Sequence, residues 1–181
     1  MKLSIFTSEL VQDELKNYIL SNQINSRHPI DVIAESKLDN TRFDVAIRDD
    51  DDTLIGFMCL HFNAGRDFYS ITDDFFINLK AMSVDDRYQN RGIGREALKD
   101  ILNFAQTSID NRIEKVILGV NVKNNGAYKA YINAGFKKRD YTVDGPYGPL
   151  YVMEKSWSQF DDVVKFASND LKFVAQSEKK W

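Results

Sequence analysis

The run Gln89-Asn90-Arg91-Gly92-Ile93-Gly94 constrains the fold of this chain more than any other segment. It lies between an apolar, strand-like stretch ending at Val84 and an amphipathic stretch beginning at Ile93. Two glycines one residue apart allow a tight turn and a close approach to a ligand. The following helix would direct its unpaired N–H groups and positive dipole end toward that turn. The run therefore predicts an anion site, with phosphate as the expected ligand, at a strand–helix junction.

Local charge supports this interpretation. Arg87, Arg91 and Arg95 cluster on the turn in a chain whose net charge is −3, and planar guanidinium groups suit phosphate oxygens. The run lacks the Gly-Lys-Ser/Thr ending of a P-loop and the third glycine of a dinucleotide fingerprint. On spacing alone, a tight turn without any ligand stays open.

Hydrophobic periodicity predicts alternating strands and helices along the chain. The expected strands cover residues 3–5, 43–47, 54–62, 75–84, 116–122, 136–143 and 150–155. The expected helices cover 8–22, a short stretch from 29, 93–105, a stretch from 124 or 125 to 134, and 158–176. This order predicts an α/β fold with a mixed sheet and helices on both faces.

The strand at 75–84 has an irregular pattern. Its apolar residues are Phe75, Ile77 and Leu79, at odd positions, and then Met82 and Val84, at even positions. Since strand side chains alternate with period two, a β-bulge near Ala81 would explain the change. The alternative is a regular strand whose Met82 and Val84 face a second buried layer.

Composition excludes several classes of protein. The chain has 181 residues, 43% hydrophobic and 28% charged, which are the proportions of a soluble globular protein. Its negative net charge disfavours a general affinity for nucleic acid or anionic membranes. One cysteine, Cys59, and two histidines make a metal site unexpected, and the start of the chain does not resemble a signal peptide. We therefore expect a cytoplasmic protein with no metal and an inert, buried Cys59 thiol.

Two segments together resemble motifs of the GCN5-related N-acetyltransferase (GNAT) family. Residues 82–95, Met82-Ser83-Val84-Asp85-Asp86-Arg87-Tyr88-Gln89-Asn90-Arg91-Gly92-Ile93-Gly94-Arg95, are similar to motif A, whose loop reads Gln/Arg-x-x-Gly-x-Gly/Ala. Asn124, Ala127, Tyr131 and Gly135-Phe136 are similar to motif B. The motifs are separated by about one strand, as in the family, and the resemblance covers roughly residues 1–155. It implies a GNAT-type, mostly antiparallel central sheet with a bulged strand before the loop.

The resemblance implies acetyl-CoA as donor and an amine as acceptor. Backbone groups of the strand segment Met82, Ser83 and Val84 would border the pantetheine, with Met82 and Val84 pairing with its amides. The loop Gln89, Asn90, Arg91, Gly92, Ile93, Gly94 and Arg95 would hold the pyrophosphate, and Asn124 would contact the cofactor arm. The suspected bulge would then free strand groups for the ligand.

The resemblance also assigns Tyr131 as the general acid that protonates the leaving thiolate. A core aromatic residue is the alternative role for Tyr131. The strand at 75–84 carries no carboxylate, so Asp73, Asp74, His61 or water alone stay open as the base. Each of the three side chains also has an ordinary structural explanation, in a loop or at a strand edge.

We therefore expect an N-acetyltransferase that acts by direct transfer in a ternary complex. A small amine or polyamine is slightly favoured as acceptor over a protein N-terminus or lysine. A non-catalytic CoA-binding regulatory module is the alternative, and a longer acyl group stays open.

We expect an acetyltransferase domain at 1–155 and a helical extension at 156–181. The apolar face of that extension would pack on the same domain or form a homodimer interface, since members of the family are often dimers.

Overall fold

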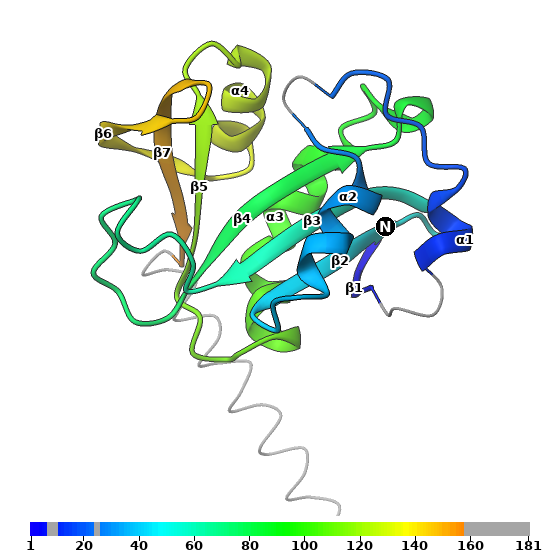
Figure 1. Cartoon of the computed structure of the whole chain (residues 1–181), viewed down its shortest axis with the longest axis horizontal. Coiled ribbons are helices and arrows are strands. Elements are labelled where there is room, and N and C mark those ends of the chain that lie inside the picture. The colour runs from blue at the N-terminus through cyan, green and yellow to red at the C-terminus, as the bar shows by residue number, and fades with distance from the viewer. Residues whose placement is uncertain (7–10, 24–25, 158–181) are drawn as a thin grey trace, which may run out of the picture.

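Within residues 1–6, 11–23 and 26–157, which the computed structural model describes, the chain forms a seven-stranded sheet flanked by helices (Figure 1). The strands are β1 (Lys2–Ile5), β2 (Arg42–Arg48), β3 (Leu54–Phe62), β4 (Phe76–Val84), β5 (Lys115–Asn121), β6 (Lys137–Gly145) and β7 (Gly148–Ser156). The helices are α1 (Val11–Leu15), α2 (Pro29–Ser36), α3 (Ile93–Ser108) and α4 (Asn125–Asn133), with a 3₁₀ turn at Asp86–Tyr88. The predicted mixed α/β fold is confirmed.

The sheet has the order β1-β2-β3-β4-β5-β7-β6. Neighbouring strands pair antiparallel, except that β4 and β5 run parallel. The β4–β5 register begins at Phe76↔Lys115 and ends at Asn78↔Ile117. Beyond that point the two strands diverge, as Figure 1 shows. The second half of β4 therefore has an edge that no strand of the sheet covers.

β4 contains the bulge that its apolar pattern suggested. Cys59 of β3 lies opposite Ala81, whereas the next residue, Leu60, lies opposite Leu79. Lys80 is thus the extra residue on β4, and its side chain is exposed. The regular-strand alternative is wrong, because the parity change comes from one inserted residue.

Two apolar layers cover the two faces of the sheet. The larger layer packs α3 against the sheet through Ala97, Leu98, Ile101, Leu102 and Ala105, which share one face of the helix. On the other face, α1 and α2 contribute Leu15, Val32 and Ile33, which pack with residues of β2 and β3, including Phe57 and Cys59. Cys59 is fully buried, and burial raises the pKa of its thiol to about 11, as expected for an inert cysteine.

The helix expected at 8–22 is shorter than predicted. α1 ends at Leu15, and residues 7–10 lie outside the described residues. Tyr18 keeps its predicted apolar role, since its side chain is buried, but Ile19 is partly exposed. The segment leaves the helix because the N–H groups of Ile19 and Ser21 donate to the carboxylates of Asp85 and Asp86, just after β4. Tertiary contacts here override helical periodicity.

The C-terminal part differs from the prediction in one detail. The stretch 144–149, expected as a connection, belongs largely to β6 and β7, which pair up to Gly145↔Gly148. Gly148 has φ of 108°, a conformation that glycine allows at such a tight hairpin. The helix predicted at 158–176 lies outside the described residues. No helix in the described ranges is long and apolar enough to cross a membrane.

Candidate functional site

The open edge of β4 presents backbone groups to solvent. The Asp85 N–H donates to the Ile55 carbonyl of β3 over 3.0 Å, which sets the direction of this part of the strand. Because backbone groups alternate along a strand, Ser83 also faces β3, whereas Met82 and Val84 face the open edge. The backbone of Met82 and Val84, which are predicted to pair with pantetheine amides, thus points away from β3.

Two side chains already occupy the carbonyls of this edge. The Ser26 hydroxyl donates to the Met82 carbonyl over 3.1 Å. The Gln89 amide donates to the Val84 carbonyl over 3.0 Å and to an Asp86 carboxylate oxygen over 2.7 Å. Gln89 thereby shapes the turn after β4. Ser26 was missed by sequence reasoning, because it lies 56 residues from its partner and no local motif marks it.

The predicted anion loop has the backbone that its glycines suggested. Asn90 has φ of 61° and Gly92 has φ of 78°, both left-handed, and α3 begins directly afterwards. The N–H of Glu96 donates to the Gly92 carbonyl and starts the helical hydrogen bonds. Among the described residues, the N–H groups of positions 91–95 have no hydrogen-bond partner. These five donors, with the helix dipole, form a site suited to a pyrophosphate.

Three arginine side chains lie around this loop. The guanidinium groups of Arg87 and Arg91 lie over the Tyr88 ring, at 5.6 and 5.4 Å from its centroid. Arg95 pairs with Glu96 over 3.2 Å and remains half exposed. The loop therefore combines backbone donors with positive charge, as the cluster of arginines indicated.

A buried carboxylate fixes the loop to the segment between α1 and α2. Asp85 is fully buried, and it accepts hydrogen bonds from the Arg87 guanidinium at 2.7 Å and from the Ile19 N–H at 3.0 Å. Burial alone would raise the pKa of Asp85, but the bonds from Arg87 and Ile19 outweigh it and keep the pKa below the ordinary value. The Tyr18 hydroxyl adds a bond of 2.9 Å to the Ser83 hydroxyl. Residues 17–21 and Ser26 thus lie along the end of β4 and the turn that follows it.

Tyr131 lies on α4 and packs against the apolar layer that contains the buried face of α3. Its ring packs edge-on against Phe136 at 5.6 Å, and its side chain is half-buried. Desolvation raises the pKa of Tyr131 to about 12, and the nearby Tyr69 adds to the rise. Tyr128 instead packs against Tyr151 of β7 at 5.4 Å. Asn124 caps α4, because its side-chain oxygen accepts from the Ala127 N–H over 3.1 Å.

The three candidate bases make bonds elsewhere. Asp73 forms an ion pair of 2.9 Å with Lys115, at the closed end of the β4–β5 pair, and this bond keeps the pKa of Asp73 below its usual value. Asp74 is exposed. His61 contacts Thr41 at 3.0 Å and Asp39 at 3.1 Å, and burial lowers the pKa of its imidazole. The structure therefore does not bring any of the three to the open edge of β4.

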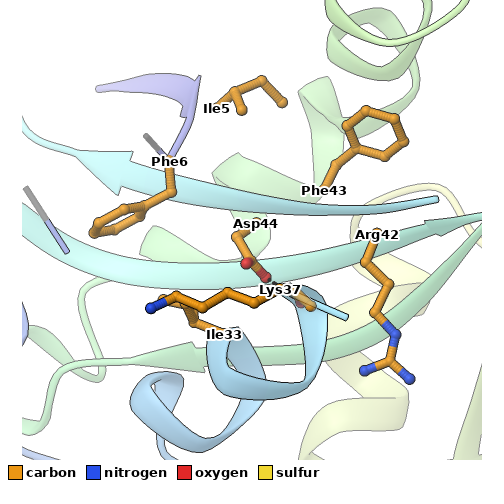
Figure 2. Close-up of a pocket in the computed structure, with 8 residues that line it drawn as sticks. Ile5, Phe6, Ile33, Lys37, Arg42, Phe43 and Asp44 are labelled. Atoms are coloured by element: carbon orange, nitrogen blue, oxygen red, sulfur yellow. Dashed lines mark hydrogen bonds between the residues drawn. The ribbon is translucent and has the colours of Figure 1, made fainter. Parts of the chain in front are cut away.

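Other parts of the structure offer no stronger site. The described residues contain no group of three or more His, Cys, Asp or Glu arranged to hold a metal. A cavity of about 150 Å³ lies between β1, β2 and α2, at the other end of the sheet (Figure 2). Its lining combines Phe6, Ile33 and Phe43 with Lys37 and Asp44. We assign no function to this cavity.

A family model matches most of this chain, and curated proteins match parts of it. The model described as the acetyltransferase (GNAT) family matches residues 8–136. The chain is 33% identical over 98 residues to N-alpha-acetyltransferase RimI of Mycobacterium tuberculosis, covering 51% of this chain and 54% of that protein. It is 31% identical over 77 residues to N-acetylaspartate synthetase of Danio rerio, covering 40% and 26%. The chain thus spans about half or less of the length of these curated relatives.

Solved structures share the fold over most of the chain. Aminoglycoside acetyltransferase AAC(6')-Ib in complex with coenzyme A matches with a TM-score of 0.66 at 14% identity, covering 89% of this chain and 97% of that one. Spermidine N-acetyltransferase of Vibrio cholerae, in complex with CoA and spermine, matches with a TM-score of 0.54 at 16% identity, covering 86% and 94%.

Proposed function

Because this chain belongs to the acetyltransferase (GNAT) family, we propose that it transfers the acetyl group of acetyl-CoA to a primary amine in a ternary complex. The observation that carries the proposal is the open edge of β4, which leads into the unpartnered N–H groups of the loop at 91–95. An elongated ligand with amides at one end and phosphates at the other suits this edge.

In this proposal, the donor lies along β4. Met82 and Val84 pair with the pantetheine amides, while Ser83 supports the strand through Tyr18. The loop from Gln89 through Asn90, Arg91, Gly92, Ile93 and Gly94 to Arg95 binds the pyrophosphate through backbone N–H groups and positive charge. Asn124, whose side-chain oxygen caps α4, has its amide N–H groups for the cofactor arm.

The thioester then reacts where β4 and β5 diverge. The amine nitrogen attacks the carbonyl carbon, and the tetrahedral intermediate collapses by breaking the carbon–sulfur bond. The Tyr131 hydroxyl gives its proton to the leaving thiolate, and the nitrogen loses one proton, which restores the Tyr131 hydroxyl through water. The products are the acetylated amine and CoA thiol. A phenol of raised pKa stays protonated at neutral pH and is ready for this role.

The amine has to lose a proton before attack. Deprotonating an alkyl ammonium of pKa 10.4 at pH 7 costs about 4.6 kcal/mol. Asp73 and His61 bind other residues, so we propose that water carries this proton to solvent. This leaves the rate dependent on the free-amine fraction.

The acceptor class is proposed as small amines or polyamines. The fold neighbours include enzymes named for spermidine and aminoglycosides, and the net charge of this chain is −3. A protein N-terminus is the second candidate, because the relative RimI is named as an N-alpha-acetyltransferase.

A thiol-release assay with acetyl-CoA tests the proposal. The acceptor panel contains spermidine, spermine, kanamycin, aspartate and short peptides with free N-termini. Release with any member supports transfer, and the ranking of rates assigns the acceptor. Binding of acetyl-CoA without release from any member would instead favour a CoA-binding regulatory module.

Three further features stay predictions. They are the division into a domain at 1–155 and an extension at 156–181, a homodimer formed through that extension, and a cytoplasmic location. The mass in solution of the full chain and of a chain ending at residue 157 tests the first two together, since loss of a dimer on truncation would locate the interface.

A further inference from the structure

Tyr69 fills a space that Gly119 leaves in the sheet. Tyr69 belongs to the connection between β3 and β4, and Gly119 lies on β5 just beyond the last β4–β5 pair. A Cβ atom placed on Gly119 would lie 3.1 Å from the Tyr69 hydroxyl oxygen and 2.9 Å from Leu150. Any larger residue at position 119 would displace the phenol. Because Gly119 has no side chain, the Tyr69 hydroxyl can lie at the point where β4 and β5 diverge.

Hydrogen bonds and ring packing hold Tyr69 in place within the connection between β3 and β4. The Tyr69 N–H donates to the Gly65 carbonyl over 2.9 Å, and the Tyr141 hydroxyl donates to the Tyr69 carbonyl over 2.6 Å. Its ring packs edge-on against Phe68 at 4.8 Å, and only 8% of the residue is exposed. The phenol is therefore pre-organised rather than mobile.

Two N–H donors face the Tyr69 oxygen. They are the backbone N–H of Gly119 and the side-chain amide of Asn78, the last β4 residue that pairs with β5. A phenol oxygen that accepts from two donors can still give its own proton to a third group. Burial raises the pKa of Tyr69 more than these donors lower it, so the proton stays on the hydroxyl at neutral pH.

Asn78 is held in this arrangement at an energetic cost. It is only 3% exposed, and its side-chain oxygen has no hydrogen-bond partner among the described residues. An unsatisfied buried polar atom destabilises the folded state. A buried oxygen without a partner suggests that the side chain has a role other than packing. We infer that this role of Asn78 is to orient the Tyr69 hydroxyl through its amide N–H group.

Tyr69 and Tyr131 pack in the apolar layers on opposite faces of the sheet. Tyr131 packs with the layer of α3, whereas Tyr69 packs with Phe76 and Ile117 on the other face. The two phenols are close enough for charge on Tyr69 to raise the pKa of Tyr131. A thioester reaching this point along β4 would therefore have one hydroxyl on each side.

We propose that the Tyr69 hydroxyl donates a hydrogen bond to the carbonyl oxygen of the bound acetyl group, with Asn78 and Gly119 orienting it. This inference rests on the proposed function. The oxygen gains negative charge as the amine adds to the carbonyl carbon, and a fixed donor stabilises that charge. Tyr69 keeps its proton throughout, while Tyr131 gives its proton to the sulfur.

The test compares binding of acetyl-CoA with binding of CoA, which lacks the acetyl group and its thioester carbonyl. Tyr69→Phe removes the hydroxyl and keeps the ring, and Tyr147→Phe is the matched control on an exposed tyrosine. Dissociation constants are measured by calorimetry for the full chain. We expect Tyr69→Phe to weaken acetyl-CoA binding about two- to tenfold, as for one hydrogen bond, while CoA binding is unchanged. Asn78→Leu should act in the same direction without lowering the unfolding temperature, since it removes the unsatisfied oxygen.

The outcomes separate this inference from the proposed function. An equal change for acetyl-CoA and CoA, or no change for either, would overturn the role of Tyr69 while leaving the donor site in place. Failure of the unaltered protein to bind either compound would overturn the proposed function, and this inference with it.

Discussion

At the scale of single residues, Tyr131 is the most consequential assignment in the proposed mechanism. Tyr131→Phe should keep the fold, because the ring and its contact with Phe136 remain. Turnover should fall by about 10²–10⁴-fold, the usual contribution of a general acid. The measurement is thiol release at saturating acetyl-CoA with the best acceptor.

The matched control for this change is Tyr128→Phe on the same helix, whose ring packs against Tyr151. It should change turnover little. Equal turnover for both variants, with the chemical step shown to limit the rate, would remove Tyr131 from the acid role.

The pH dependence of the rate follows from two pKa values. Tyr131 acts when protonated, and its pKa of about 12 keeps it protonated across the accessible range. The acceptor acts when neutral, so kcat/KM should rise about tenfold per pH unit below the amine pKa of about 10.4. Rates between pH 6 and pH 9.5 check this, with far-UV circular dichroism as a control for folding. A plateau beginning near pH 7 would instead reveal a protein base.

At the scale of elements, the junction of β4 and α3 depends on the left-handed backbone of Gly92. Gly92→Ala should cost about 1–2 kcal/mol of unfolding free energy, because a side chain is disfavoured at a φ of 78°. It should also weaken acetyl-CoA binding by distorting the N–H groups of the loop. Denaturant unfolding and calorimetry measure the two effects.

Gly126→Ala is the control for that change. Gly126 lies in the first turn of α4, where the nearest atom to an added Cβ would be an Asn124 oxygen at 3.9 Å. Here alanine should stabilise the protein by about 0.5–1 kcal/mol. Similar effects at both glycines would show that the loop does not need its special backbone.

In the proposed complex, Ser26 competes with the donor for a backbone carbonyl on the β4 edge. Ser26 occupies the Met82 carbonyl, which the proposed complex gives to a pantetheine amide. Ser26→Ala should therefore tighten acetyl-CoA binding about two- to tenfold, the value of one hydrogen bond. Ser21→Ala is the control, since Ser21 is bonded through its backbone N–H. Weaker binding by Ser26→Ala would instead make the hydroxyl part of the donor site.

At the scale of the whole molecule, donor binding should appear as stability. A ligand at 100 times its dissociation constant adds about 2.7 kcal/mol to the free energy of unfolding. For a domain of this size the unfolding temperature should rise by about 5 °C or more. Thermal unfolding with acetyl-CoA, and with ATP at the same concentration as a control, measures the effect. No shift with acetyl-CoA would contradict the donor assignment.

Much of the molecule was predictable because its signals are local. The strand–turn–helix at 84–93 was read from glycine spacing, the bulge from a change of apolar parity, and α3 from its apolar stripe. Helix 8–22 was overpredicted, because hydrogen bonds from Ile19 and Ser21 to Asp85 and Asp86 replaced the helical ones. Those partners lie about 65 residues away, where periodicity carries no information.

The sequence by itself determined the order of the described elements, the family and the left-handed turn before α3, since each depends on residues within a few positions of one another. The tertiary structure alone decided which groups meet at the divergence of β4 and β5. Tyr69 reaches Gly119, Asn78 is left with an unsatisfied oxygen, and Ser26 covers Met82 only after the sheet has formed. Contacts across a sheet join residues by space rather than by spacing, and the candidate chemistry of this protein depends on such contacts.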